Sequence, residues 1–225
     1  IVALAPQVRG TLYDLGVDPV GIYNEGDEYI SPRYRDKIAG AAVIGGAGEL
    51  DLEKIAAAKP DLIIGVDYEW NTKDYSQLSQ IAPTVIVDGT TWQGAAQATA
   101  DAVGKDDELA ALDKQFDERA AAIKSQYADV LAKYRWDIVQ GGFDDGKFWL
   151  YGPKSDVGAI LSDAGVQFAS ASAGVTGPEN KAISYENLDT LTSADAIAST
   201  PTTTTPPPTT VRSSSSRRAS RACPR

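Results

Sequence analysis

Histidine and methionine are absent from this 225-residue sequence, and cysteine occurs once, as Cys223. Without histidine there is no Ser-His-Asp triad, no Cys-His dyad and no histidine-ligated zinc or iron site. A single cysteine also excludes an internal disulfide and a cysteine-ligated cluster. We therefore expect no metal site and no catalytic residues of the usual kinds. Because Ile1 stands where a start methionine would, we expect a processed or trimmed chain.

Positive charge is scarce in most of the chain. The net charge is −10, and residues 199–225 hold five arginines and no acidic residue, so residues 1–198 carry a net charge of −15. A body this acidic repels phosphate backbones, which argues against nucleic-acid binding. No apolar run approaches the ~20 residues that span a bilayer. Any membrane attachment is therefore expected through a signal or lipid anchor upstream of Ile1.

Residues 199–225 also have almost no apolar side chains to bury, and proline, threonine, serine and arginine dominate them. This composition predicts a disordered tail. Three explanations compete: a mucin-like or wall-spanning stalk, a basic interaction tail, and out-of-frame translation of a GC-rich gene. We favour the last.

In residues 1–105, short apolar runs alternate with helical patterns. Strands are predicted at 1–5, 19–23, 61–66 and 84–87, and helices at 11–15, 51–58, 74–80 and 93–103. This alternation predicts an α/β fold, with a parallel sheet covered by helices on both faces.

A long helix is predicted at 107–134, because its apolar residues advance by three and four positions in one continuous stripe. These are Leu109, Leu112, Phe116, Ala120, Ile123, Tyr127, Val130, Leu131 and Tyr134. At ~1.5 Å per residue such a helix is about 42 Å long, which suits a bridge between two lobes better than packing within one.

A shorter α/β stretch follows the long helix. Strands are predicted at 137–141, 147–151 and 194–198, and helices at 155–164 and 184–191. The chain is thus divided into an N-terminal lobe (1–105), a bridging helix (106–135), a partial C-terminal lobe (136–198) and the tail (199–225). The second lobe is expected to be too small to close a core comfortably.

Aromatic side chains gather where the predicted strands of the first lobe end. In open parallel sheets ligands bind outside the carboxyl ends of the strands, where Gln7 and residues 24–35 lie. The aromatic residues there are Tyr29, Tyr34, Tyr68, Trp70, Tyr75 and Trp92, accompanied by Arg33 and Arg35. Each alone could simply cover a helix end. Together they suit a large ligand with planar or apolar faces.

Two other motifs favour structural interpretations. The stretch 44–49, IGGAGE, matches neither GxGxxG nor a Walker loop, and we expect a glycine-rich turn into the helix at Asp51. The carboxylate pairs Asp67/Glu69 and Asp144/Asp145 could serve a glycosidase, but the second pair precedes Gly146 in a predicted hairpin turn. A carboxylate-dependent α/β enzyme acting on a glycan or nucleotide sugar remains an alternative function.

Glu53 and Glu186 occupy matching positions, each in the first turn of a helix that leads into a strand. An acidic residue there complements the helix dipole, which accounts for each one separately. Their occurrence once in each lobe suggests a symmetric pair of docking points.

Taken in order, several segments resemble the ABC-importer substrate-binding proteins whose two lobes are joined by one long helix, and which capture ferric siderophores, haem or cobalamin. The resemblance implies two Rossmann-like lobes with parallel sheets bridged by a single long α-helix. The segments are IVALAP, LYDLGVDPVGIY, LDLEKIAAAKPDLIIG, QIAPTVIVDG, KFWLYGPKSDVGAILSDAGV and ISYENLDTLTSADAI.

The resemblance implies binding without catalysis or a cofactor. A monomer outside the cytoplasm, periplasmic or lipid-anchored, would hold a ferric siderophore in an interlobe cleft and deliver it to an importer permease. The family's zinc and manganese binders use histidine, which this chain lacks. Because the body is acidic, we expect hydroxamate-type or mixed ligands rather than highly anionic tris-catecholates.

The family's functional positions carry over residue by residue. The permease-docking glutamates match Glu53 and Glu186. The cleft aromatics after the third strand match Tyr68 and Trp70, and those of the strand leading into YGPKS match Trp149 and Tyr151. Loop position alone adds Arg33 and Trp92 as ligand contacts.

The sequence departs from the family after ADAIA, where further strands and helices would finish the second lobe but PTTTTPPP follows instead. We therefore expect an incomplete second lobe with an open sheet edge, in a truncated or frameshifted chain. A non-functional truncated product is a further alternative.

Overall fold

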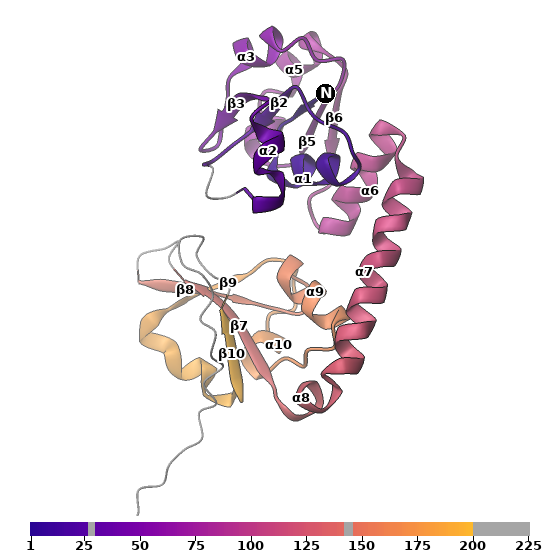
Figure 1. Ribbon diagram of the computed structural model, residues 1–225. Coiled ribbons are helices and arrows are strands. Elements are labelled where there is room, and N and C mark those ends of the chain that lie inside the picture. The colour runs from indigo at the N-terminus through magenta and orange to yellow at the C-terminus, as the bar shows by residue number, and fades with distance from the viewer. Residues whose placement is uncertain (27–29, 142–145, 200–225) are drawn as a thin grey trace, which may run out of the picture. The chain divides into compact units, whose positions relative to one another are not determined.

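The computed structural model describes residues 1–26, 30–141 and 146–199. The chain divides into two compact units, Ile1–Arg119 and Ala120–Arg225. Each unit has its own β-sheet, and both are drawn in Figure 1. Within the described residues no helix has both the length and the apolar character that crossing a bilayer requires.

The first unit is built on a six-stranded sheet in the order β4-β3-β2-β1-β5-β6. Every neighbouring pair is parallel except β3 and β4, so the predicted parallel sheet is confirmed. Its strands are β1 (Val2–Ala3), β2 (Gly21–Tyr23), β3 (Ala42–Gly46), β4 (Glu49–Leu50), β5 (Ile63–Val66) and β6 (Thr84–Val87).

Alternate residues of the first strand enter two different cores, because successive side chains of an extended chain point to opposite faces. Val2 and Leu4 pack with helices α3 (Leu52–Ala57) and α5 (Tyr75–Ile81). Ala3 and Ala5 pack with α1 (Pro6–Asp14) and α6 (Trp92–Val103). Both faces of the sheet are therefore covered, and each fully buried Leu or Ile contributes roughly 1.5–3 kcal/mol.

Local signals in the sequence set the helix ends. The Asp51 carboxylate accepts a hydrogen bond from the Lys54 N–H at 3.0 Å and caps α3, and the Thr91 hydroxyl accepts one from the Gly94 N–H at 3.1 Å and caps α6. α6 ends at Gly104, whose φ of 66° is left-handed and favours glycine. The first helix begins at Pro6, earlier than the predicted residue 11, because proline suits the first helical position.

Residues 44–49 correct the prediction of a simple glycine-rich turn. They form most of a β3-β4 hairpin in which Gly46 pairs with Glu49. The two residues between them, Ala47 and Gly48, have φ of 51° and 78°, which a type I′ hairpin turn requires. A Cβ at Gly45 would lie 2.4 Å from the Glu49 carbonyl oxygen, so glycine is needed there.

Three short helical segments also went unpredicted: η2 (Pro32–Tyr34), α2 (Arg35–Ile38) and α4 (Glu69–Thr72).

The long helix is present but shorter than predicted. α7 (Asp106–Gln126) runs from the first unit into the second, and α8 (Ala128–Lys133) follows it. Tyr127 separates them with φ −112° and ψ 20°, outside helical values. The apolar stripe continues across Tyr127, so periodicity alone could not reveal the interruption.

The second unit holds a four-stranded sheet in the order β10-β7-β8-β9. Its strands are β7 (Trp136–Gly141), β8 (Lys147–Tyr151), β9 (Lys181–Ser184) and β10 (Ala196–Ser199). Only β7 and β10 pair in parallel, which corrects the expectation of a parallel second sheet. β10 is an edge strand and includes Ser199, one residue beyond the predicted boundary. Asp144 and Asp145, and the tail beyond Ser199, lie outside the described residues.

One face of the second sheet packs on a small core of Phe148, Leu150, Val175 and Leu191. The sequence predicted that the second lobe is too small to close a core comfortably. The cluster that the structure contains there has four buried residues. Leu191 comes from η3 (Tyr185–Ser193), a 3₁₀ segment with a kink at Asn187, where an α-helix was predicted. The remaining helices are α9 (Asp156–Asp163) and α10 (Ser170–Ala173).

Candidate ligand-binding site

The topology of the first unit predicts a ligand crevice at the carboxyl ends of β1 and β5. From β1 the chain winds outward through β2 and β3, then returns to β5 on the other side of β1. Such a reversal opens a ligand crevice outside the strand ends. Gln7 follows β1 and Tyr68 follows β5, and the Gln7 side-chain amide donates a hydrogen bond to the Tyr68 hydroxyl. The two predicted edge residues therefore meet across the switch point.

Tyr68 and Trp70 form an aromatic pair beside this crevice. Their ring centroids lie 4.6 Å apart, and Trp70 also stacks on the ring of Tyr23, 6.3 Å away. Tyr23 is fully buried, so the core of the first unit supports the pair from below. Both predicted residues are half-buried, and each presents only part of its surface to a ligand.

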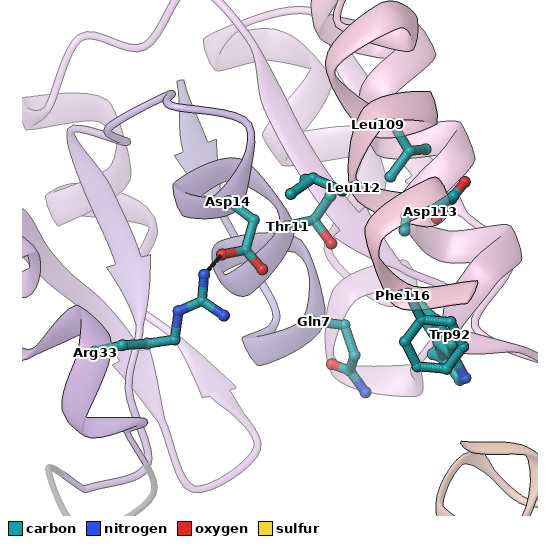
Figure 2. A pocket seen from close by; sticks show the side chains of 10 residues that line it. Gln7, Thr11, Asp14, Arg33, Trp92, Leu109, Leu112, Asp113 and Phe116 are labelled. Atoms are coloured by element: carbon teal, nitrogen blue, oxygen red, sulfur yellow. Dashed lines mark hydrogen bonds and ion pairs between the residues drawn. The ribbon is translucent and has the colours of Figure 1, made fainter. Parts of the chain in front are cut away.

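A pocket of about 370 Å³ opens in the first unit between α1, α6 and α7. Figure 2 shows the side chains around it, with Arg33 reaching in from η2. Its lining residues are Gln7, Thr11, Asp14, Arg33, Trp92, Ala96, Leu109, Leu112, Asp113 and Phe116. The predicted residues Trp92 and Arg33 thus belong to one cavity.

Phe116 also lines the pocket, although the sequence did not predict it as a ligand contact. The Trp92 and Phe116 rings pack edge to face at 5.3 Å, with an interplanar angle of 66°. Phe116 was predicted only as part of the apolar stripe on the long helix. No local signal distinguishes it from the other members of that stripe, because its partner comes from another helix.

Arg33 is held at the pocket by Asp14. Its guanidinium lies 2.6 Å from the Asp14 carboxylate (Figure 2), and its carbon Cζ lies 4.9 Å from the centre of the Tyr34 ring. The Tyr34 hydroxyl donates to the same carboxylate at 2.6 Å. Burial and, after it, this hydrogen bond to Asp14 raise the pKa of Tyr34. The charge of Arg33 is therefore offset by a neighbour rather than left for a ligand.

In the second unit, Trp149 and Tyr151 lie on one face of β8, opposite the face that carries Phe148 and Leu150 into the core. Trp149 pairs across the sheet with Gln140, and the Tyr151 hydroxyl donates to the Gln140 side-chain oxygen. Burial raises the pKa of Tyr151, which is only 9% exposed. These two predicted residues are brought together within their own unit.

Glu53 and Glu186 are both exposed. Glu53 stands in the first turn of α3, where the helix dipole favours an acid. Glu186 stands in the first turn of a 3₁₀ segment, and its backbone N–H donates to the Ser184 hydroxyl at 3.3 Å. Among the ion pairs of the described residues, none involves either glutamate.

Asp67, considered above as half of a carboxylate pair, has a structural contact. Its carboxylate accepts a hydrogen bond from the Gly89 N–H at 2.9 Å, which ties the loop after β5 to the loop after β6. This contact holds the two strand ends together and favours the structural interpretation of the pair.

Comparisons with known proteins identify the family of the chain. A family model described as "Periplasmic binding protein" matches residues 1–211. The probable siderophore-binding lipoprotein YfiY of Bacillus subtilis is 32% identical over 73% of the chain and 50% of its own length. The Fe(3+) dicitrate-binding periplasmic protein FecB of Escherichia coli is 31% identical over 79% of the chain and 59% of its own length. The chain thus spans between half and three fifths of the length of these two relatives.

Solved structures of siderophore-binding proteins are also similar to this chain. The siderophore periplasmic binding protein from the fuscachelin gene cluster of Thermobifida fusca matches with a TM-score of 0.70 and 28% identity, over 88% of this chain and 74% of that one. FhuD2 of Staphylococcus aureus with bound ferrioxamine B matches with a TM-score of 0.73 and 26% identity, over 88% and 76%.

Proposed function

Because the chain belongs to the periplasmic binding protein family, we propose that it captures a ferric siderophore outside the cytoplasm and delivers it to the permease of an ABC importer. The observation that carries the proposal is a set of aromatic side chains in the first unit, with Tyr68 packed on Trp70 after β5 and Trp92, after β6, packed on Phe116 of α7. Relatives with siderophore-binding and ferric-citrate-binding names support the ligand class. Membership of a transport-binding family does not favour the alternative of a carboxylate-dependent enzyme.

The proposed mechanism is capture without a chemical step. Aromatic faces bind the planar and apolar parts of a chelate through dispersion and quadrupole contacts. Gln7, fixed by its hydrogen bond to Tyr68, adds a polar group between the strand ends. The iron belongs to the ligand, so the protein needs no metal ligands of its own.

The proposal includes specific roles. Arg33, Tyr68, Trp70 and Trp92 in the first unit would contact the chelate, as would Trp149 and Tyr151 in the second. Glu53 and Glu186 would dock on permease arginines. The protein would act as a monomer, either free in a periplasm or held by a lipid anchor at the outer face of the cell membrane.

Isothermal titration of the 225-residue chain tests the proposal. The ligands are ferric trihydroxamate, ferric tris-catecholate, ferric citrate, haem and cobalamin. We expect saturable one-to-one binding of at least one ferric siderophore, with quenching of tryptophan fluorescence. Binding of haem or cobalamin alone would overturn the siderophore assignment, and binding of none of the five would overturn the proposed function.

A further inference from the structure

We propose that the pocket between α1, α6 and α7 receives an uncharged or cationic aliphatic part of the chelate, and that the chain therefore prefers ferric trihydroxamates to anionic ferric catecholates and ferric citrate. This inference rests on the proposed function and narrows its ligand class. It depends on the apolar wall of the pocket, on its charges and on two unpaired polar atoms.

The wall of the pocket formed by α6 and α7 is apolar. Half of the ten lining residues are aliphatic or aromatic: Trp92, Ala96, Leu109, Leu112 and Phe116. Leu109 is buried, and Leu112 packs against the same cluster, so the wall is anchored in the core of the unit. An alkyl chain loses its contact with water against such a wall, whereas a carboxylate or catecholate oxygen loses hydration without compensation.

The charges of the pocket disfavour an anion. Of the ten lining residues three are charged, the carboxylates Asp14 and Asp113 and the guanidinium of Arg33. Figure 2 shows the guanidinium directed at Asp14, 2.6 Å away. Arg33 is thus already paired, and the lining as a whole carries one net negative charge. An anionic ligand would need to displace Asp14 from Arg33 before it gained an ion pair.

Three other cations of the first unit also have partners within the protein. Lys37 pairs with Asp18 at 3.0 Å and Lys73 pairs with Glu49 at 3.2 Å. The buried Arg9 donates to the Tyr23 carbonyl oxygen at 2.7 Å, and burial lowers its pKa. Lys37, Lys73 and Arg9 therefore each have a partner within the protein that an anionic ligand would have to replace.

Two polar atoms of the lining residues suit the amide groups of a chelate's backbone instead. The Gln7 side-chain oxygen and the Trp92 indole nitrogen are buried, and neither has a hydrogen-bond partner among the described residues. One is an acceptor and the other a donor. An amide group supplies both complements, whereas a deprotonated carboxylate or catecholate supplies only acceptors.

The test compares ligands that differ in charge. The full chain is titrated calorimetrically with a ferric linear trihydroxamate that ends in an ammonium group, its neutral N-acetylated form, ferric citrate and a ferric tris-catecholate. We expect both trihydroxamates to bind roughly tenfold or more tightly than either anion. Tighter binding of an anion would overturn the inference and leave the proposed function standing, whereas binding of none of the four would overturn both.

A matched pair of variants tests the role of the pocket. Asp14→Asn frees Arg33, while Asp18→Asn removes the carboxylate partner of Lys37, which does not line the pocket. We expect Asp14→Asn to raise the affinity for ferric citrate severalfold, with the gain reduced at high salt, and Asp18→Asn to leave it unchanged. Equal effects of the two variants on the affinity for ferric citrate, or no effect of either, would show that the charges of the pocket do not determine which ligands the protein prefers. Circular dichroism checks that both variants are folded, and the ligand comparison on the unmodified chain tests the inference independently.

Discussion

At the scale of single residues, Asp14 offsets the positive charge of Arg33, a predicted ligand contact. One carboxylate accepts hydrogen bonds from both Arg33 and Tyr34, each at 2.6 Å. The sequence places an arginine at the strand ends but does not show which residue lies beside it. The structure supplies the neighbour that offsets this charge, 19 residues away in the chain. A side chain's role therefore depends on its partner as much as on its type.

The titration of Tyr34 gives a prediction at this scale. Burial raises its pKa most, and the hydrogen bond to Asp14 and the charge of that carboxylate raise it further. In Asp14→Asn the pKa of Tyr34 should fall toward the ordinary value for tyrosine of about 10 but stay above it, because burial remains. Difference absorbance of tyrosinate between pH 9 and 12, measured against Tyr34→Phe to identify the residue, checks this. No downward shift would contradict the proposed contact.

Trp92 gives a second prediction. Trp92→Ala removes the edge-to-face contact with Phe116 and part of the pocket wall, so ferric trihydroxamate should bind roughly tenfold more weakly. Tyr127→Ala is the control, because Tyr127 is an aromatic residue 49% exposed and does not line the pocket. Calorimetry measures both affinities. Similar affinity in the Trp92 variant and the unmodified chain would exclude Trp92 as a ligand contact.

At the scale of elements, helix N-termini position the site. The cap of α6 fixes the residue before Trp92, and the cap of α3 fixes the turn that presents Glu53. In both cases a side-chain oxygen satisfies a backbone N–H that has no partner within the helix. Loss of a cap should therefore disturb both the stability of the unit and the placement of a site residue.

Thr91→Ala tests the cap of α6. The variant loses the hydrogen bond from the Gly94 N–H, and the free energy of unfolding of the first unit should fall by about 1 kcal/mol. Thr91→Ser keeps the hydroxyl and should lie close to the unmodified chain. Urea unfolding monitored by tryptophan fluorescence measures both. Equal losses in the two variants would point to the lost methyl group rather than the cap.

Asp51 supplies a pH prediction. Hydrogen bonds from Lys54, first from its backbone N–H, hold the pKa of this carboxyl below its ordinary value. A lowered pKa in the folded state means that the stabilisation is present above the unfolded value of about 3.9 and is lost as the pH falls through the lower folded value. Asp51→Asn keeps a capping oxygen without a titrating group. Its stability should fall less steeply than that of the unmodified chain below about pH 4, as urea unfolding would show; parallel curves would contradict this.

At the scale of the whole molecule, we expect different residues to serve the proposed ligand capture and the proposed permease docking. Glu53 lies in the first unit and Glu186 in the second, both exposed, and neither is near a lining residue of the pocket in sequence. If the proposed docking role is correct, ligand affinity and transport should respond differently when these residues change.

The double variant Glu53→Lys/Glu186→Lys tests docking. Ligand affinity should stay within about twofold, because both residues are exposed and neither lines the pocket, while uptake of the ferric chelate by cells should be lost. Glu118→Lys/Glu179→Lys is the matched control, with the same charge change at one exposed residue in each unit. Cellular uptake of radiolabelled iron is the measurement. Equal loss of uptake in both variants would attribute the effect to net charge instead of to docking.

Several features followed from the sequence because their causes are local. Short continuous apolar runs identified the strands β1, β2, β5 and β6, since a strand that is buried on both faces of a parallel sheet is apolar throughout. The hairpin at 44–49 was missed, because its turn depends on two positive φ angles that the glycine-rich pattern does not specify. The break at Tyr127 was missed because the apolar stripe runs through it.

The α/β class and the positions of Gln7, Tyr68 and Trp70 at strand ends follow from the amino-acid sequence, because chain direction puts the residues after parallel strands at one edge. Which of the remaining candidates share a cavity depends instead on how the helices pack in three dimensions. Trp92 meets Phe116 and Arg33 meets Asp14 through the packing of separate helices, and such contacts have no local signal. The charge and the wall of the pocket therefore depend on the fold rather than on any motif.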